Sequence, residues 1–325
     1  MFKRIYRHWF IAGLIGLFLI TLGDASGMVS EVGKWLKFNH GPDIVIILIF
    51  LFSGLSLDVE QIKSGITDIS GLVLALVLIF FISPVLACLF GLGPINREIK
   101  IGLFLVAVMP TTLSSGVIMT GVSGGNMAHA LMITVLANSL SIFTIPLSLS
   151  ILLAHIGNGG AVEIDKAAIM IKICWSVLGP LFLGLWIKQH LPSMMAPFLK
   201  RLPVLNQIFV LGIVWMALAQ SRQVIINSGH MSVVIFAVVF LFHGSLMAAS
   251  FSATEIFGVK PGRRESVILM GGQKTLPLSV ILQVSLFPQS GLVLVVCVMH
   301  HIVHLMMDGW FVTFLKKAHG SLRAS

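Results

Sequence analysis

Charged residues are scarce in this sequence: Asp, Glu, Lys and Arg together make up only 10% of its 325 residues. A soluble domain carries about 25%, so too few polar side chains are present to cover a water-facing surface. Hydrophobic residues make up 57%. This balance excludes a soluble enzyme, a disordered chain and a nucleic-acid-binding domain, despite the net charge of +9. We therefore expect an integral membrane protein.

Cysteine is also rare, and a cleavable leader is not evident. The three cysteines each lie inside an apolar run, which excludes a disulfide framework; they are Cys88, Cys174 and Cys297. The first apolar stretch, from Trp9 to Leu22, follows basic residues but lacks a small-x-small cleavage site. We interpret it as a retained transmembrane helix.

Hydropathy predicts ten membrane spans joined by short loops. Their expected ranges are 8–23, 42–57, 69–92, 98–121, 127–154, 166–189, 203–221, 231–256, 264–286 and 289–315. With the N-terminus in the cytoplasm, the inner segments hold 13 Lys and Arg and the outer segments hold 7, and Lys274 lies within a span. This bias predicts that both termini are cytoplasmic.

Ten spans divide into two sets of five, and an odd set places the second copy upside down relative to the first. One spacing supports such a repeat. Arg97 is followed 13 residues later by Pro110, and Arg264 is followed 13 residues later by Pro277. The expected inverted repeats are residues 1–160 and 161–325.

The fourth and ninth spans are each interrupted near the middle. Pro110 lacks an amide donor, and hydroxyl side chains that can cap a restarting helix follow it: Thr111, Thr112, Ser114 and Ser115. In the ninth span a glycine pair (Gly271, Gly272) is expected to end one half, with Thr275 capping the next and Pro277 in its first turn. Paired interruptions indicate a transporter binding site; the alternative is a simple kink at each proline.

Lys274 would place a positive charge at this predicted binding site. It lies ten residues beyond Arg264, which is roughly 15 Å along a helix and so near the middle of the bilayer. Half-helix N-termini carry partial positive charge, and together with Lys274 they would suit an anion. The alternative is a structural ammonium group that binds carbonyls freed by the helix breaks.

Other polar groups lie within predicted spans. In the tenth span His300, His304 and Asp308 are four residues apart and share a helix face. Such a face could bind a metal, relay protons or form interhelical hydrogen bonds. Thr134 and Gln273 could join helices through hydrogen bonds or bind a ligand.

Two segments carry a family resemblance: PTTLSSGVIMTGVSGGN (110–126) and GGQKTLPLSV (271–280). With the His301 region, they resemble the bile acid/sodium symporter superfamily, and most closely its divergent SBF-like branch of bacterial transporters. The resemblance implies an all-α fold of ten spans in an inverted five-helix repeat, with broken helices four and nine crossing at the midplane. It also implies a panel domain and a core domain. The panel would hold about 8–57 and 166–221, and the core about 69–154 and 231–315.

The resemblance places three residues at polar sodium-ligand positions: Ser115, Thr134 and Gln273. However, Gly116 stands where sodium-coupled members have Asn, Leu269 where they have Glu, and Lys274 where they have another Asn. A hard cation needs several oxygen ligands, and no anionic ligand remains among these positions. The sequence therefore predicts transport that tolerates removal of sodium and depends on pH through Lys274.

Together these observations predict a secondary active transporter of a small organic anion in a bacterial inner membrane, coupled to H⁺ or Na⁺. No enzymatic activity, cofactor or nucleic-acid partner is expected, and the surroundings are membrane lipid. The expected binding residues are Thr111, Thr112, Ser114, Ser115, Thr134, Gln273, Lys274, Thr275 and His301. Three alternatives remain open. They are a classical sodium-coupled symporter of bile-acid-like anions, a non-transporting regulator or receptor, and an intramembrane hydrolase that pairs Ser114 or Ser115 with a histidine.

Overall fold

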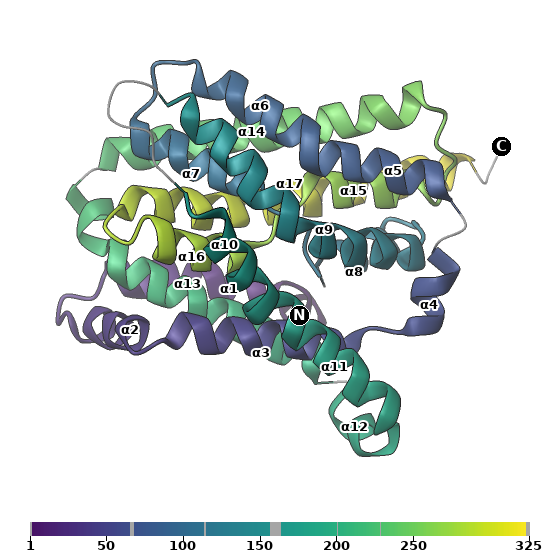
Figure 1. The fold of residues 1–325 in the computed structure, drawn as a ribbon, viewed down its shortest axis with the longest axis horizontal. Helices are drawn as coiled ribbons and strands as arrows, with labels where there is room; N and C mark the ends of the chain where they lie inside the picture. The colour runs from purple at the N-terminus through teal and green to yellow at the C-terminus, as the bar shows by residue number, and fades with distance from the viewer. Residues whose placement is uncertain are drawn as a thin grey trace.

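A computed structural model describes residues 2–65, 68–113, 115–156, 164–199, 201–227 and 229–322. Within these ranges every regular element is a helix (Figure 1). The first half contains α1 (Phe2–Leu22), α2 (Met28–Phe38), α3 (Gly41–Ser56), α4 (Val59–Ser64), α5 (Ile69–Val77), α6 (Ser83–Gly91), α7 (Arg97–Ala107), α8 (Ser115–Val122) and α9 (Met127–Ala154). The second contains α10 (Lys166–Ile173), α11 (Gly179–His190), α12 (Pro192–Leu199), α13 (Leu202–Asn227), α14 (Gly229–Ile256), α15 (Arg264–Gly272), α16 (Leu276–Leu286) and α17 (Gly291–Leu322).

Two of the long helices contain a π-helical turn directly before a proline. The π segment Leu78–Ile82 joins α5 to α6, and Cys174–Leu178 joins α10 to α11. Pro84 and Pro180 lie in the first turn after these segments. A proline cannot donate the usual backbone bond and crowds the preceding turn, so the helix widens locally instead of ending. Carbonyls in the widened turn are then available to side chains.

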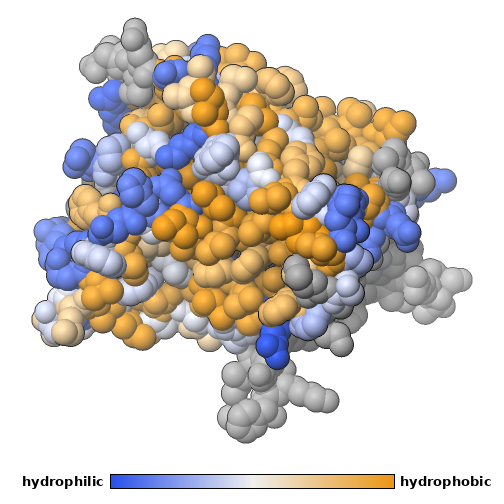
Figure 2. Space-filling view, turned by 60° about the horizontal axis from the view of Figure 1, so that its bottom comes forward, coloured by the Kyte–Doolittle hydropathy of each residue, from blue (hydrophilic) through white to orange (hydrophobic). Residues whose placement is uncertain are grey.

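The helices are long and apolar, as expected of a membrane protein. Among the described residues seven helices are long and apolar enough to cross a bilayer, or eight if α2 and α3, which meet at 74°, form one span. The broken fourth span falls outside this count because α7 and α8 are each short. Figure 2 shows an orange band across the middle of one face, with hydrophilic residues mostly toward its left and right edges. The multi-pass fold is confirmed, whereas the count of ten and the inverted repeat stay predictions.

The helices pack in two groups. In the lower part of Figure 1, α3 packs against α11 and α13, and α1 and α2 pack against α13. In the upper part, α14 packs against α15 and α17, and α7 packs against α17. The groups meet where α13 contacts α17 and where α10 contacts α9.

Glycine sets the closest of these approaches. A Cβ on Gly54 of α3 would collide with the Leu181 carbonyl of α11, and one on Gly184 would collide with the Leu51 carbonyl. The paired glycines let the two backbones touch. Small residues serve this purpose in membrane helices because lipid provides no hydrophobic force between them.

Candidate functional site

The two predicted helix breaks are present and touch each other. The first separates α7, which ends at Ala107, from α8; the second separates α15, which ends at Gly272, from α16. The Thr275 amide donates a hydrogen bond of 3.0 Å to the Pro110 carbonyl, which joins the breaks directly. Both arms begin at the predicted arginines, since α7 starts at Arg97 and α15 at Arg264. Four half-helix ends therefore meet inside the protein, at a point we call the crossing.

Side chains from both breaks form one hydrogen-bonded group at the crossing. The Thr112 hydroxyl donates to Gln273 Oε1 at 2.6 Å and accepts from the Gly116 amide at 3.1 Å, which caps α8. The Ser115 hydroxyl lies 2.9 Å from Thr112 Oγ1 and 3.3 Å from Gln273 Oε1. Ser115 therefore bonds to the crossing and not to a histidine, which gives the hydrolase alternative no support. Ser114 lies outside the described residues.

Gly116 permits this arrangement. A Cβ at Gly116 would stand 2.9 Å from Gln273 Oε1 and 2.6 Å from Met270 Sδ. Both distances are too short for a real Cβ contact, so a side chain here would displace Gln273. The absence of a side chain at this position thus brings the Gln273 amide against α8.

Thr111 and Thr134 lie beside this group. Thr134 donates to the Ala130 carbonyl at 2.9 Å, with the Thr112 carbonyl at 3.4 Å. Asn138, which is not among the expected binding residues, donates through Nδ2 to the Thr111 carbonyl at 3.4 Å. Thr111 Oγ1 and Asn138 Oδ1 are buried and have no hydrogen-bond partner among the described residues. A polar residue one helical turn after Thr134 was the available signal for Asn138.

Lys274 is 2% exposed and ends on backbone carbonyls. Its ammonium donates three hydrogen bonds, each of 3.0 Å, to the carbonyls of Ile79, Ala107 and Met109. Ile79 belongs to the π turn, and the other two carbonyls are freed by the break after α7. An ammonium group has three donors, so all of them are used. This is the geometry of the structural alternative, in which Lys274 fixes the second break to the first.

Two other predicted binding residues, Thr275 and His301, lie outside the hydrogen-bonded side-chain group at the crossing. Thr275 stands at the N-cap position of α16, but its side chain makes no capping hydrogen bond with the described residues. Pro277 lies in the first turn of that helix, as expected. His301 does not bond to the described residues of the crossing. Its ring instead contacts Phe10 of α1 edge-on, with the two ring centroids 6.4 Å apart.

A buried carboxylate adjoins the crossing. Gln273 Nε2 donates to Asp308 Oδ2 at 2.7 Å, and His243 Nε2 lies 2.9 Å from Asp308 Oδ1. Asp308 is 1% exposed and His243 is fully buried. The predicted ligand positions contain no negative charge, and no sequence pattern connects His243 with Asp308. The four-residue spacing of His304 and Asp308 indicates a polar face on α17, but it does not indicate that α14, which contains His243, packs against that face.

Three more histidine rings cluster with His243, the partner of this carboxylate. The ring centroids of His300 and His304 lie 5.5 and 5.7 Å from that of His243, and His301 lies 4.7 Å from His304. Among the described residues no group of three or more His, Cys, Asp or Glu is arranged to hold a metal ion.

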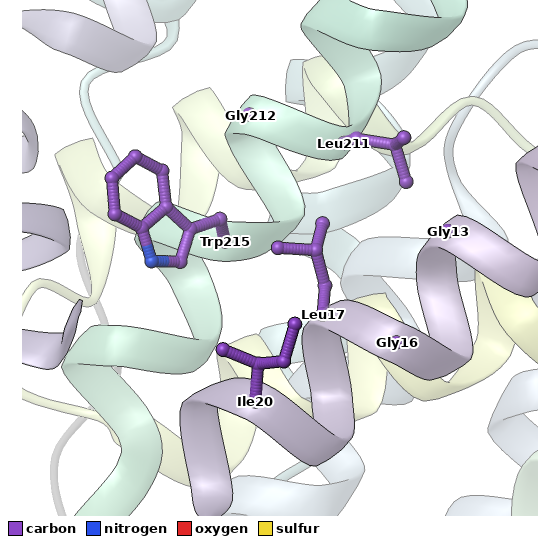
Figure 3. Close-up of a pocket in the computed structure, with 7 residues that line it drawn as sticks. All are labelled: Gly13, Gly16, Leu17, Ile20, Leu211, Gly212 and Trp215. Atoms are coloured by element: carbon purple, nitrogen blue, oxygen red, sulfur yellow. The ribbon is translucent and has the colours of Figure 1, made fainter. Parts of the chain in front are cut away.

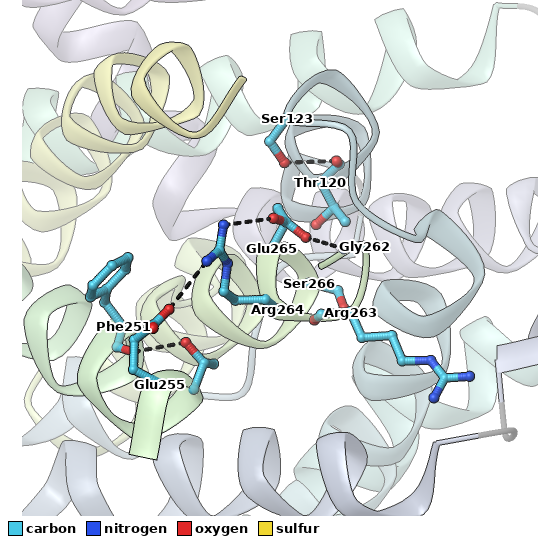
Figure 4. Close-up of polar contacts among 10 residues, drawn as sticks. Thr120, Ser123, Phe251, Glu255, Gly262, Arg263, Arg264, Glu265 and Ser266 are labelled. Carbon is cyan, nitrogen blue, oxygen red and sulfur yellow. Dashed lines mark hydrogen bonds and ion pairs between the residues drawn. The ribbon is translucent and has the colours of Figure 1, made fainter. Parts of the chain in front are cut away.

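A second polar cluster joins the start of α15 to neighbouring turns (Figure 4). The buried Glu265 accepts from the Gly262 amide at 2.6 Å, and Arg264 lies 3.1 Å from Glu255 and 3.5 Å from Glu265. Nearby, Asp68 caps α5 through the Gly71 amide and pairs with Arg263 at 3.4 Å. Burial alone would raise the pKa of Asp68, but bonds from Ser70 and Gly71 and the charge of Arg263 hold it below its usual value. This cluster fixes one end of the α15 arm.

Two cavities lie away from the crossing. One of about 360 Å³ lies between parts of α1 and α13; its lining offers almost no polar atom and consists of Gly13, Gly16, Leu17, Ile20, Leu211, Gly212 and Trp215 (Figure 3). Another of about 330 Å³ includes Lys37, His40, Asp43 and Lys172 on one side and Ser285 and Gln289 on the other. None of the predicted binding residues lines either cavity, because Thr112, Gln273 and Lys274 are buried. The crossing is closed in this conformation.

Comparison with known proteins identifies relatives along nearly the whole chain. Residues 8–317 match the model of the SBF-like CPA transporter family. The chain is 30% identical over 276 residues, 80% of its length, to the "Probable sodium/metabolite cotransporter BASS4, chloroplastic" of Arabidopsis thaliana, of which it spans 62%. It is also 25% identical over 293 residues to the "Sodium/bile acid cotransporter 7-B" of Xenopus laevis. This match covers 86% of the present chain and 82% of the Xenopus protein. These relatives are transporters and not enzymes. The chain belongs to the SBF-like CPA transporter family, within the bile acid/sodium symporter superfamily.

Proposed function

We propose that this protein is a secondary active transporter of a small organic anion, working by alternating access in a bacterial inner membrane. One observation carries the proposal: two interrupted helices meet at a buried group formed by Thr112, Ser115 and Gln273. Unpaired backbone is tolerated at membrane depth only where protein or a substrate cavity satisfies it. The cotransporter names of the relatives agree with this assignment.

In this proposal a core domain rocks against a panel domain. The panel comprises about residues 8–57 and 166–221, and the core about 69–154 and 231–315, in ten spans arranged as an inverted repeat with both termini cytoplasmic. The packing supports this division, since α7, α8 and α16 of the crossing all pack against α17 and α15 packs against α14. Alternation would expose the crossing first on one side of the membrane and then on the other.

Charge favours an anionic substrate. The 330 Å³ cavity is lined by α2, α3, α10 and α13 on one side and by α16 and the residues after it on the other, so it lies at the seam between the groups. Lys37 has no partner among the described residues, while Lys172 pairs with Asp43 at 3.5 Å. A basic mouth raises the local concentration of anions. The N-termini of α8 and α16 then point partial positive charge at the crossing.

The coupling ion is H⁺ or Na⁺. Ser115, Gln273 and Thr134 offer oxygen atoms near one another, and sodium stands in the names of the relatives. A classical sodium-coupled symporter of bile-acid-like anions therefore stays the first alternative, and a non-transporting regulator or receptor the second.

A two-step experiment tests the proposal. A thermal-shift screen of small organic anions on the purified protein identifies a ligand, and uptake of that ligand is then measured in proteoliposomes with sodium or with choline. We expect saturable uptake that Gln273→Leu abolishes and that continues in choline. Binding without uptake would support the receptor alternative, and strict sodium dependence would restore the sodium symporter.

A further inference from the structure

We propose that Asp308 takes up a proton when the anion binds, and that the Gln273 amide transmits this protonation to the crossing. The inference rests on the proposed transport function and names H⁺ as the coupling ion. It moves the proton-carrying role from Lys274, whose three donors all end on carbonyls, to the Asp308–His243 pair.

The orientation of the Gln273 amide depends on whether Asp308 is protonated, because the nitrogen and the oxygen of the amide face different partners. Its Nε2 donates to Asp308 Oδ2 at 2.7 Å, while its Oε1 accepts from Thr112 at 2.6 Å. An ionised carboxylate only accepts hydrogen bonds, so it holds Nε2 on its own side. A protonated Oδ2 becomes a donor and then favours Oε1 instead, which turns the amide over.

The turned amide suits an anion. With Asp308 ionised, the Gln273 amide oxygen faces the crossing, and the negative charge of Asp308 would repel a bound anion at short range. With Asp308 protonated, the crossing receives the amide N–H groups, and the Thr112 and Ser115 hydroxyls no longer have Oε1 as their acceptor. These donors can then bind a carboxylate or sulfonate group. Proton and anion therefore bind together, which is the requirement of symport.

His243 decides which carboxylate oxygen takes the proton. Its Nε2–H donates to Asp308 Oδ1 at 2.9 Å, so the oxygen left to accept a proton is Oδ2, which faces Gln273. A proton from water in the open crossing adds to Oδ2, and Asp308 becomes neutral while His243 keeps its Nε2–H on Oδ1. His300, His304 and His301 extend the buried imidazole cluster from His243 toward Phe10 of α1.

Among the described residues, His243 on α14 is the titratable group that bonds to Asp308. The other titratable groups close to it in the chain or next to its partners are the three histidines that precede it on α17 and Lys274, which follows its partner Gln273. Helices α8 and α16 contain no titratable residue. Those of α7 and α15 lie in their first turns, Arg222 of α13 binds carbonyls near Thr21, and Glu255 of α14 pairs with Arg264.

Infrared difference spectroscopy tests the inference with protons as the only probe. The purified protein is stepped in pH through the range in which carboxyl and imidazole groups titrate. We expect a protonated-carboxyl band that disappears as the pH rises, together with changes in amide bands. The band should be lost in Asp308→Asn and retained in Glu265→Gln, the matched control at another buried carboxyl. If Asp308→Asn does not fold, Asp308→Glu should shift the band.

A band that persists in Asp308→Asn, or that does not move in Asp308→Glu, would overturn the inference. Because the titration needs no transport, it can succeed when uptake is absent and fail when uptake is present. The two proposals therefore stand or fall separately. In transport itself, Asp308→Asn should still exchange bound anion but lose at least tenfold of the uptake driven by a pH gradient.

Discussion

Single buried side chains at the crossing serve several partners at once. Gln273 bonds to Thr112 and Asp308, and Lys274 bonds to three carbonyls from two separate segments. A buried polar group left without its partner costs about 1–3 kcal/mol. Substitutions here should therefore be more costly than equal changes at the protein's edge.

Lys274→Met should be strongly destabilising. The side chain keeps most of its volume but loses all three donors. The carbonyls of Ile79 and Met109 then lose the side-chain donor that they have here, and the Ala107 carbonyl keeps only the Ser83 hydroxyl. We expect a loss of several kcal/mol, on the order of 1–3 for each carbonyl, measured as a lower midpoint of thermal unfolding. Lys188→Met, which removes a lysine that binds the single carbonyl of Leu57, is the matched control. Equal midpoints for the two variants would contradict the structural role of Lys274.

Gly116→Ala should disturb the crossing. The added methyl group would stand 2.9 Å from Gln273 Oε1, and overpacking of this kind costs about 1–3 kcal/mol. We expect weaker ligand binding and a lower unfolding midpoint. Gly309→Ala on α17 is the control, since nothing lies within 4 Å of a Cβ built there. Unchanged binding in Gly116→Ala would show that Gln273 can move without cost.

Among the elements, the interruptions could be predicted from the sequence and the pairing between helices could not. The interruptions arise from the local backbone preferences of Pro110, Gly272 and Pro277. They can therefore be predicted from the neighbouring sequence alone. The contact between His243 and Asp308 joins residues 65 positions apart and depends on how α14 packs against α17. Lys274 was recognised as central, but its partners include a carbonyl of a π turn that no local pattern indicated.

The α3–α11 contact allows a prediction about helix packing. Gly54→Val should force these helices apart, because the new side chain would enter the Leu181 carbonyl. We expect poor yield of folded protein or a marked drop in unfolding midpoint. Gly212→Val on α13, where a Cβ meets nothing within 4 Å, controls for the β-branched residue itself. A stable Gly54→Val protein would mean that the close approach is not required.

At the scale of the whole molecule, the orientation in the membrane is fixed by charge. The excess of Lys and Arg in alternate loops predicts that both termini and the loop at Gly262 face the cytoplasm. Reporter fusions at Gly262 and at Ser325 should both give a cytoplasmic signal. A periplasmic signal from either fusion would refute the ten-span arrangement.

The central claim is that the crossing is a binding site that opens alternately to each side of the membrane. Thr275 is buried and Ser115 only partly exposed in the closed conformation, so their accessibility reports opening. Single cysteines at Ser115 and Thr275, in a background without Cys88, Cys174 and Cys297, are treated with small aqueous thiol reagents in right-side-out and inside-out vesicles. We predict labelling from both sides, slowed by the bound anion. Two cysteines that stay inert in every condition would contradict the account.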